Sequence, residues 1–272
     1  MFRALLVTLL SSVLFVSVVQ AKQIVLSGST SVTRVMDVLA EKYNKEYPED
    51  YIAVQGADST AGIVLAEKGV ADFGMSSRYL TEAEANEQIA IVPIAHDGIA
   101  IATNIQNPVQ SLTRDQLAKI YLGEINNWKE VGGPDQAIAV VTREASSGSR
   151  YSFETQLGLT KVINGQSVSN INAKSLVVNS NGMMKTLINN NPQAIGFVSM
   201  GSIDRSIKAV ELEGIKPTQK NIANGKYKLA RPFLIIYKKD HLEERAEKFL
   251  NYVLSNQGQQ LIESYGYTAV KH

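Results

Sequence analysis

Residues 137–157 read AIAVVTREASSGSRYSFETQL, an apolar β-type run followed by a small-residue turn and an amphipathic run. The turn places an arginine, serines and a glycine where a helix should begin. The first turn of a helix presents unpaired backbone N–H groups and about half a unit of positive charge, which suits a bound anion. Arg143 adds a planar fork of donors, and the serines add hydroxyl donors. This stretch therefore predicts a strand, an anion-binding turn and a helix, in that order.

The same unit recurs in the first third of the chain. Apolar runs at residues 23–26, 51–55 and 70–75 each lead into a turn rich in Ser, Thr or Gly, and helical patterns follow the first two turns. Strands that alternate with helices indicate an α/β fold with a mainly parallel sheet. Ligands of such sheets bind beyond the carboxyl ends of the strands, where these turns should lie.

The chain is long enough for two lobes, and it is expected to cross between them twice. About 250 residues exceed one typical hydrophobic core. Residues 96–98 and 230–232 adjoin short β-rich runs and are the predicted crossings. The predicted boundaries are residues 22–97 for the first part of lobe 1, 98–231 for lobe 2 and 232–272 for the return to lobe 1. Two crossing strands would allow the lobes to close around a ligand like a hinge.

Residues 1–21 have the pattern of a secretory signal peptide. Arg3 precedes an apolar run at residues 4–19, and small residues suit cleavage after Ala21. The run is shorter than most membrane-spanning helices. The sequence contains no cysteine, which excludes a lipid anchor on cysteine and a disulfide framework. These features predict an exported protein that is free in a periplasm.

The charge balance argues against nucleic acid and anionic membranes as partners. Lys and Arg total 27 and Asp and Glu total 26. Arg3 is the only charged residue of the leader, so the remaining chain has no net charge. Both kinds of partner favour a large basic excess.

The predicted site gathers hydroxyl and backbone donors around one cation, Arg143. Its members follow predicted strands: Ser29, Thr30, Ser31, Ser59, Thr60, Ser76, Ser77, Ser147, Gly148 and Ser149. Each Ser or Thr taken singly could instead be an ordinary helix N-cap, worth about 1 kcal/mol of stability. Asp58 is expected to cap a helix rather than touch a ligand, and Arg143 could alternatively pair with Glu144 or Asp135 at the surface. Arg78 and Arg150 are expected to be structural or to lie at the rim.

Signals of an enzyme are weak. The sequence has no phosphate-binding P-loop and no Gly-x-Ser-x-Gly elbow. Its histidines, at positions 96, 241 and 272, lack the spacing of metal ligands. We expect neither a metal nor a cofactor, and we expect His96 and Trp128 to be structural.

Several ordered blocks resemble the phosphate-binding protein of bacterial high-affinity phosphate ABC transporters. They are residues 28–30, 58–63, 71–78, 112–128, 143–153 and 194–198. The resemblance covers nearly the whole chain beyond the leader. It implies a two-lobed periplasmic binding protein fold, phosphate as the ligand, and an ABC permease in the inner membrane as the partner of a monomer that is not an enzyme.

The resemblance also implies which residues bind phosphate. Positions matching the family's phosphate contacts are Thr30, Ser59, Arg143, Ser147, Gly148 and Ser149, to which the pattern adds Ser29 and Ser77. Many members have an aspartate at the position of Ser77, which accepts the proton of phosphate and repels sulfate. Ser77 carries no charge, so Asp58 is a possible substitute acceptor. Alternatives are another tetrahedral oxyanion (sulfate, molybdate or tungstate), a secreted phosphoester hydrolase, or an adhesion role.

Overall fold

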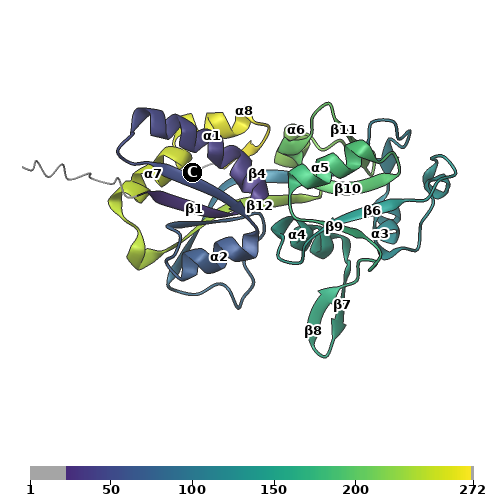
Figure 1. The fold of residues 1–272 in the computed structure, drawn as a ribbon, viewed down its shortest axis with the longest axis horizontal. Helices are drawn as coiled ribbons and strands as arrows, with labels where there is room; N and C mark the ends of the chain where they lie inside the picture. Colours follow the sequence, from purple (N-terminus) through teal and green to yellow (C-terminus); the bar gives the residue numbers. More distant parts are fainter. Residues whose placement is uncertain (1–22, 271–272) are drawn as a thin grey trace, which may run out of the picture.

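Two lobes lie side by side and are joined by a pair of long strands (Figure 1). The computed structural model describes residues 23–270. Strands β4 (Ile89–Asn104) and β12 (Ala230–Lys238) run antiparallel through the junction. The main sheet has the order β2-β1-β3-β12-β4-β10-β6-β9. Because lobe 1 contributes the strands beside β12 and lobe 2 contributes the strands beside β4, the crossing strands are at once the centre of the sheet and the link between the lobes.

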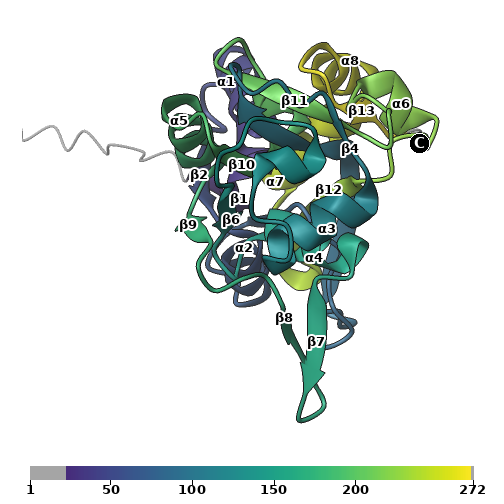
Figure 2. The same ribbon diagram turned by 90° about the vertical axis from the view of Figure 1, so that its right-hand side faces the viewer.

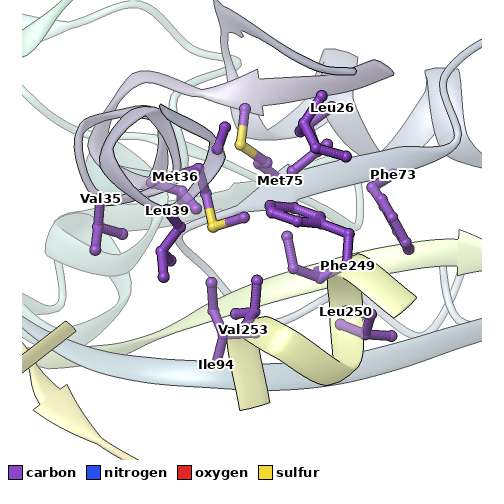
Figure 3. Close-up of a cluster of buried hydrophobic side chains, with 14 of the residues drawn as sticks. Leu26, Val35, Met36, Leu39, Phe73, Met75, Ile94, Phe249, Leu250 and Val253 are labelled. Carbon is purple, nitrogen blue, oxygen red and sulfur yellow. The ribbon is translucent and has the colours of Figure 1, made fainter. Parts of the chain in front are cut away.

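Lobe 1 is a parallel three-stranded unit closed by the crossing strands. Strands β2 (Ile52–Ala57) and β3 (Phe73–Ser76) both pair in parallel with β1 (Ile24–Ser29). Helix α1 (Thr30–Glu46) packs on one face with α7 (Glu244–Leu254) and α8 (Asn256–Ser264), and the cluster of Figure 3 fills the space between them. On the other face, α2 (Ser59–Glu67) packs against β3 and β12.

Lobe 2 repeats this arrangement with a core of its own. Strand β6 (Ala139–Arg143) pairs in parallel with β10 (Ala194–Ser199) and with β9 (Leu176–Val178). Helices α3 (Arg114–Leu122) and α4 (Gly148–Leu157) surround stacked rings of Phe153 and Phe197, whose centroids lie 4.2 Å apart. Helix α5 (Asn181–Asn190) packs against β10 and β4. Trp128 is fully buried in this core, as expected of a packing residue.

The remaining elements are short. They are β5 (Ser111–Leu112), η1 (Trp128–Val131), β7 (Thr160–Ile163), β8 (Gln166–Ser169), η2 (Met200–Ser202), β11 (Ile207–Leu212), α6 (Gln219–Ala223), η3 (Lys239–His241) and β13 (Thr268–Ala269). Strands β7 and β8 form a hairpin that projects from lobe 2 (Figure 2). None of the helices within residues 23–270 is long and apolar enough to cross a membrane. The predicted leader lies outside the described residues.

Several boundaries differ from the sequence-based expectation. The strand patterns at residues 89–94 and 99–103 belong to one continuous strand, β4, because residues 96–98 keep pairing with β12 through the crossing. Strand β3 starts at Phe73 rather than at residue 70, because residues 68–70 are bonded back to the end of α2. The β7–β8 hairpin was not expected, although Asn164 and Gly165, both at positive φ, form a turn typical of hairpins. Strand β7 is exposed along its whole length and β8 is at most half-buried, so neither has a buried face that would impose hydrophobic alternation.

A partly buried ion pair holds the turn after β3. The Nη1 and Nη2 atoms of Arg78 each donate to Glu84 at 2.7 Å, and the hydroxyl of Thr81 donates to the same carboxylate. The Arg78 guanidinium also lies over the ring of Tyr151 in lobe 2, 5.1 Å from its centroid. The bonds from Arg78 are the main reason that the pKa of Glu84 is lowered to about 2. Arg78 is therefore structural, as the sequence suggested.

We predict an acid-sensitive contribution to stability from this pair. Because the pKa of Glu84 is depressed in the folded protein, the contribution is complete above the ordinary value of 4.5 and is lost as pH falls toward about 2. Its size should be about 1 kcal/mol, since solvent screens a partly exposed pair. Urea unfolding of the wild type and of Glu84→Gln across pH 2–7 measures it. The difference between the two proteins should shrink at low pH, and a constant difference would contradict the assignment.

Candidate anion-binding site

Four helices begin at the cleft between the lobes. In lobe 1, Ser29 caps α1 and Asp58 caps α2, whereas in lobe 2 Ser147 caps α4 and Ser180 caps α5. Each of these helices follows a strand whose carboxyl end lies at the cleft. The four N-termini therefore direct the positive ends of their dipoles, and their unpaired N–H groups, toward one place.

The hydroxyls of lobe 1 form one chain of hydrogen bonds. The hydroxyl of Ser29 donates to Ser77 Oγ at 2.9 Å, and the backbone N–H of Ser77 donates to Ser59 Oγ at 3.0 Å. The oxygens of Ser59 and Ser77 lie 3.4 Å apart. All three side chains are buried. The structure thus brings Ser29, Ser59 and Ser77 together from the ends of three parallel segments.

Contacts across the cleft join the turns of lobe 1 to the turns of lobe 2. The Thr60 hydroxyl donates to the Ser146 carbonyl at 3.1 Å, and Ser31 Oγ lies 3.2 Å from Ser149 Oγ. Gly148 packs directly against Ser59, and a Cβ added to Gly148 would overlap Ser59 Oγ and lie 2.9 Å from Ser77 Oγ. The lobes are therefore closed on each other, and glycine is the residue that permits this approach.

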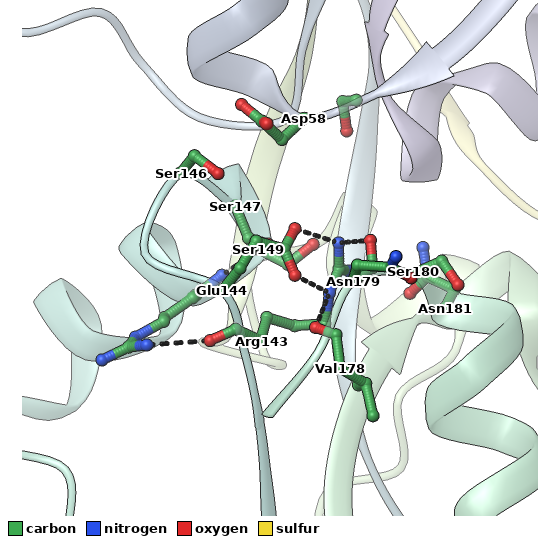
Figure 4. Close-up of polar contacts among 12 residues, drawn as sticks. Asp58, Arg143, Glu144, Ser146, Ser147, Ser149, Val178, Asn179, Ser180 and Asn181 are labelled. Atoms are coloured by element: carbon green, nitrogen blue, oxygen red, sulfur yellow. Dashed lines mark hydrogen bonds and ion pairs between the residues drawn. The ribbon is translucent and has the colours of Figure 1, made fainter. Parts of the chain in front are cut away.

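Arg143 is buried in the wall of lobe 2 and paired with its neighbour. Its Nη2 donates to Glu144 at 2.8 Å and to the Asn179 carbonyl at 2.9 Å, and its Nε donates to Glu144 and to the Val178 carbonyl, each at 3.2 Å (Figure 4). The pairing with Glu144 was the alternative weighed from sequence; in this pair Arg143 is buried and Glu144 is partly exposed. Asp135, the other alternative, instead pairs with Lys129.

Two buried donors at the cleft have no partner within the protein. They are Arg143 Nη1 and Thr30 Oγ1. Thr30, Asp58 and Glu144 line a pocket of about 350 Å³ at the mouth of the cleft, together with Gly56, Ala57, Asn179 and Ser180. Figure 4 shows Asp58 facing Glu144 and Ser147 across this mouth. Since buried donors are normally satisfied, the two unpartnered groups indicate where a ligand oxygen would bind.

The structure also gives the partners of the other charged residues that were predicted to lie near the cleft. Asp58 accepts from the backbone N–H of Ala61 at 2.8 Å and caps α2, which confirms its role as a cap. Arg150 pairs with Glu154 at 2.7 Å, so it is structural. Within residues 23–270, no group of three or more His, Cys, Asp or Glu side chains is placed to hold a metal ion.

An ion pair at the floor of the cleft was not predicted from the sequence. Arg231 and Asp97 face each other in the register of the two crossing strands, and their side chains are fully buried. Nε and Nη2 of Arg231 donate to Asp97 at 3.1 and 2.9 Å. Burial raises the pKa of Asp97 and lowers that of Arg231, while each partner's charge opposes the shift of the other. The sequence signal was present, because both residues interrupt apolar runs at the predicted crossings.

Asn181 was also missed as a member of the site. Its Nδ2 donates to Ser31 Oγ at 2.9 Å, and its Oδ1 accepts from the backbone N–H of Ser199 at 3.0 Å. The amide thus links the first turn of α5 to the first turn of α1, across the two lobes. Ser180 and Asn181 follow a short strand, the pattern that identified the other turns, but no cation adjoins them in sequence.

Comparison with known proteins gives a consistent family. A family model described as a PBP superfamily domain matches residues 18–257. The phosphate-binding protein PstS of Bacillus subtilis is 31% identical over 249 residues, covering 90% of this chain and 80% of that protein. An ABC-type phosphate transport receptor from Vibrio cholerae is 56% identical with a TM-score of 0.76, covering 91% of this chain and 100% of that one.

A second solved structure superposes more closely despite a lower identity. It is a phosphate ABC transporter substrate-binding protein from Clostridium perfringens with bound phosphate. The two chains are 38% identical with a TM-score of 0.87, and the match covers 92% of this chain and 100% of that one.

We predict that Gly148→Ala prevents full closure of the lobes. The added methyl group would occupy the position of the Ser59 hydroxyl, whereas each lobe keeps its own core. Small-angle scattering with a saturating tetrahedral oxyanion should give a larger radius of gyration for the variant than for the wild type. Gly182→Ala is the matched control, because the nearest atom to its added Cβ is 3.8 Å away. Equal radii for all three proteins would show that the Gly148 contact does not limit closure.

Proposed function

This chain belongs to the PBP superfamily and, within it, to the phosphate-binding proteins of the PstS type, and we propose that it captures inorganic phosphate between its lobes. The observation that carries the proposal is the pair of unpartnered buried donors, Arg143 Nη1 and Thr30 Oγ1, beside four helix N-termini. A tetrahedral oxyanion is the class of ligand that such donors satisfy.

Phosphate would contact both lobes and thereby stabilise the closed arrangement. Donors from lobe 1 would be Thr30, Ser59 and Ser77. Donors from lobe 2 would be Arg143, Ser147, Gly148 and Ser149, the glycine through its backbone N–H. Ser29 would act through Ser77, because its hydroxyl hydrogen is already donated there. A ligand shifts an open–closed equilibrium only by its differential affinity, which contacts to both lobes provide.

The proposed physiological role is delivery of phosphate to the permease of an ABC transporter. The leader pattern at residues 1–21 supports export to a periplasm. The separate cores of the two lobes support boundaries near residues 97 and 231, with hinge motion about the crossing strands. The protein would act as a monomer that binds its ligand without making or breaking a bond.

Thr30→Val should weaken phosphate binding without destabilising the protein. Because Thr30 Oγ1 has no partner within the protein, its loss leaves no other group unsatisfied. The expected cost in binding is about 1–2 kcal/mol, the value of one hydrogen bond to a charged ligand. Calorimetric titration of protein that has been unfolded and refolded to remove endogenous ligand measures it. Thr103→Val is the matched control, since Thr103 also has a buried unpartnered hydroxyl but lies on β4 away from the cleft.

Removing the Arg143 guanidinium should weaken binding more strongly. Arg143→Ala combined with Glu144→Gln avoids leaving a partly buried carboxylate without its partner. The expected loss is about 1.5–3 kcal/mol, or roughly tenfold to 150-fold in dissociation constant. The same titration applies, with Glu144→Gln alone as the control for the companion change. A dissociation constant equal to that of the control would place the anion elsewhere in the cleft.

A further inference from the structure

Arg231 uses every one of its donors inside the protein. Nε and one hydrogen of Nη2 bind Asp97. The other hydrogen of Nη2 is donated to Ser31 Oγ at 3.0 Å, and the two on Nη1 go to Ser149 Oγ at 2.6 Å and Ser77 Oγ at 3.2 Å. A guanidinium has five N–H groups, so none remains for a ligand. Arg231 can therefore act on a bound anion only through these three hydroxyls.

The acceptor capacity of two of these hydroxyls is exhausted. Ser77 Oγ accepts from Arg231 and from the hydroxyl of Ser29. Ser31 Oγ accepts from Arg231 and from Asn181, whose amide orientation is fixed because its oxygen accepts from the N–H of Ser199. A hydroxyl has two lone pairs and one hydrogen. Ser77 and Ser31 can therefore only donate any further hydrogen bond.

The Ser149 hydroxyl oxygen is also surrounded by hydrogen-bond donors. Its oxygen accepts the shortest of the bonds from Arg231 and lies 3.2 Å from Ser31 Oγ, which has only its hydrogen left to give. If Ser31 donates to it, both lone pairs of Ser149 are occupied and its hydrogen is free for a ligand. The three hydroxyls come from both lobes. Their hydrogen bonds to Arg231 are therefore complete only when the lobes are closed.

We infer that Arg231 is a positioning residue that, directly and through Ser31, makes Ser77 and Ser149 a donor-only wall, which selects the unprotonated oxygens of the anion. This inference rests on the proposed binding of phosphate in the cleft. It replaces the expectation that Ser77 could accept the proton of phosphate. The proton of hydrogenphosphate then has to face the mouth, where the carboxylates of Asp58 and Glu144 lie. Sulfate carries no proton and can accept a hydrogen bond from every donor, so this wall does not exclude it.

Arg231→Met combined with Asp97→Asn tests the inference. The double change removes both buried charges together and frees lone pairs on the three hydroxyls. Sulfate should lose about tenfold to a hundredfold in affinity, because polarised donors to a charged ligand are lost. Phosphate should lose less, since the freed hydroxyls can accept its proton. Calorimetric titrations of sulfate and phosphate into stripped protein, at a pH where phosphate is mainly hydrogenphosphate, give the ratio of the two dissociation constants.

Controls separate positioning from a purely structural role. Tyr227→Phe removes a buried hydrogen bond to the Ile99 carbonyl beside the crossing and leaves the three hydroxyls unchanged. The ratio of its sulfate and phosphate dissociation constants should therefore equal that of the wild type. Arg231→Lys keeps the charge but has three donors in place of five. Its ratio of sulfate to phosphate dissociation constants should lie between those of the wild type and the double variant. This single variant decides the question if the double variant does not fold.

The outcomes also separate this inference from the function on which it rests. Wild-type protein that binds neither anion would overturn the proposed function. Wild-type protein that binds phosphate but not sulfate would overturn the donor-only wall and leave the function intact. Equal weakening of both anions in the Arg231 variants would show that Arg231 only supports the fold. A ratio that shifts against sulfate in both variants and not in Tyr227→Phe supports the inference.

Discussion

The ion pair between Arg231 and Asp97 is the interaction on which the closed cleft depends. Removing two charges from water costs several kcal/mol per ion, and the attraction between them offsets this only when their remaining hydrogen bonds are also made. Here the guanidinium makes its remaining hydrogen bonds with hydroxyls from both lobes. The pair therefore couples three things that could have been independent: the register of the crossing strands, the apposition of the lobes and the orientation of the site's hydroxyls.

Around this pair, each buried arginine of the cleft is balanced by a carboxylate. Arg231 is balanced by Asp97, and Arg143 by Glu144. The positive potential at the cleft comes instead from four helix N-termini, because strands that end at one edge of a sheet place the following helices there. Each lobe encloses its own hydrophobic core, so opening the cleft would break polar contacts between the lobes and leave apolar packing within them intact.

The sequence reveals those parts of the site that depend on local signals. Ser29, Asp58 and Ser147 were predictable because an N-cap requires a particular residue type directly after a strand and before a helix. Arg231 and Asp97 were not, because their contact depends on the pairing of strands 134 residues apart. Sequence can indicate that a charge interrupts an apolar run. It does not indicate which distant charge will lie opposite, nor which hydroxyls a buried guanidinium will reach.

The two arginines consequently have different tasks, although both are buried. Arg143 is held by Glu144 and two carbonyls so that only Nη1 is left without a partner, which fixes the direction of that one donor before a ligand arrives. Such preorganisation lowers the entropy lost on binding. Arg231 has no donor left and can influence a ligand only through the serines it polarises. An anion in this cleft would thus meet one directed cation, hydroxyls and helix ends. These contacts come from both lobes and separate when the lobes open, and both arginines then remain paired with their carboxylates.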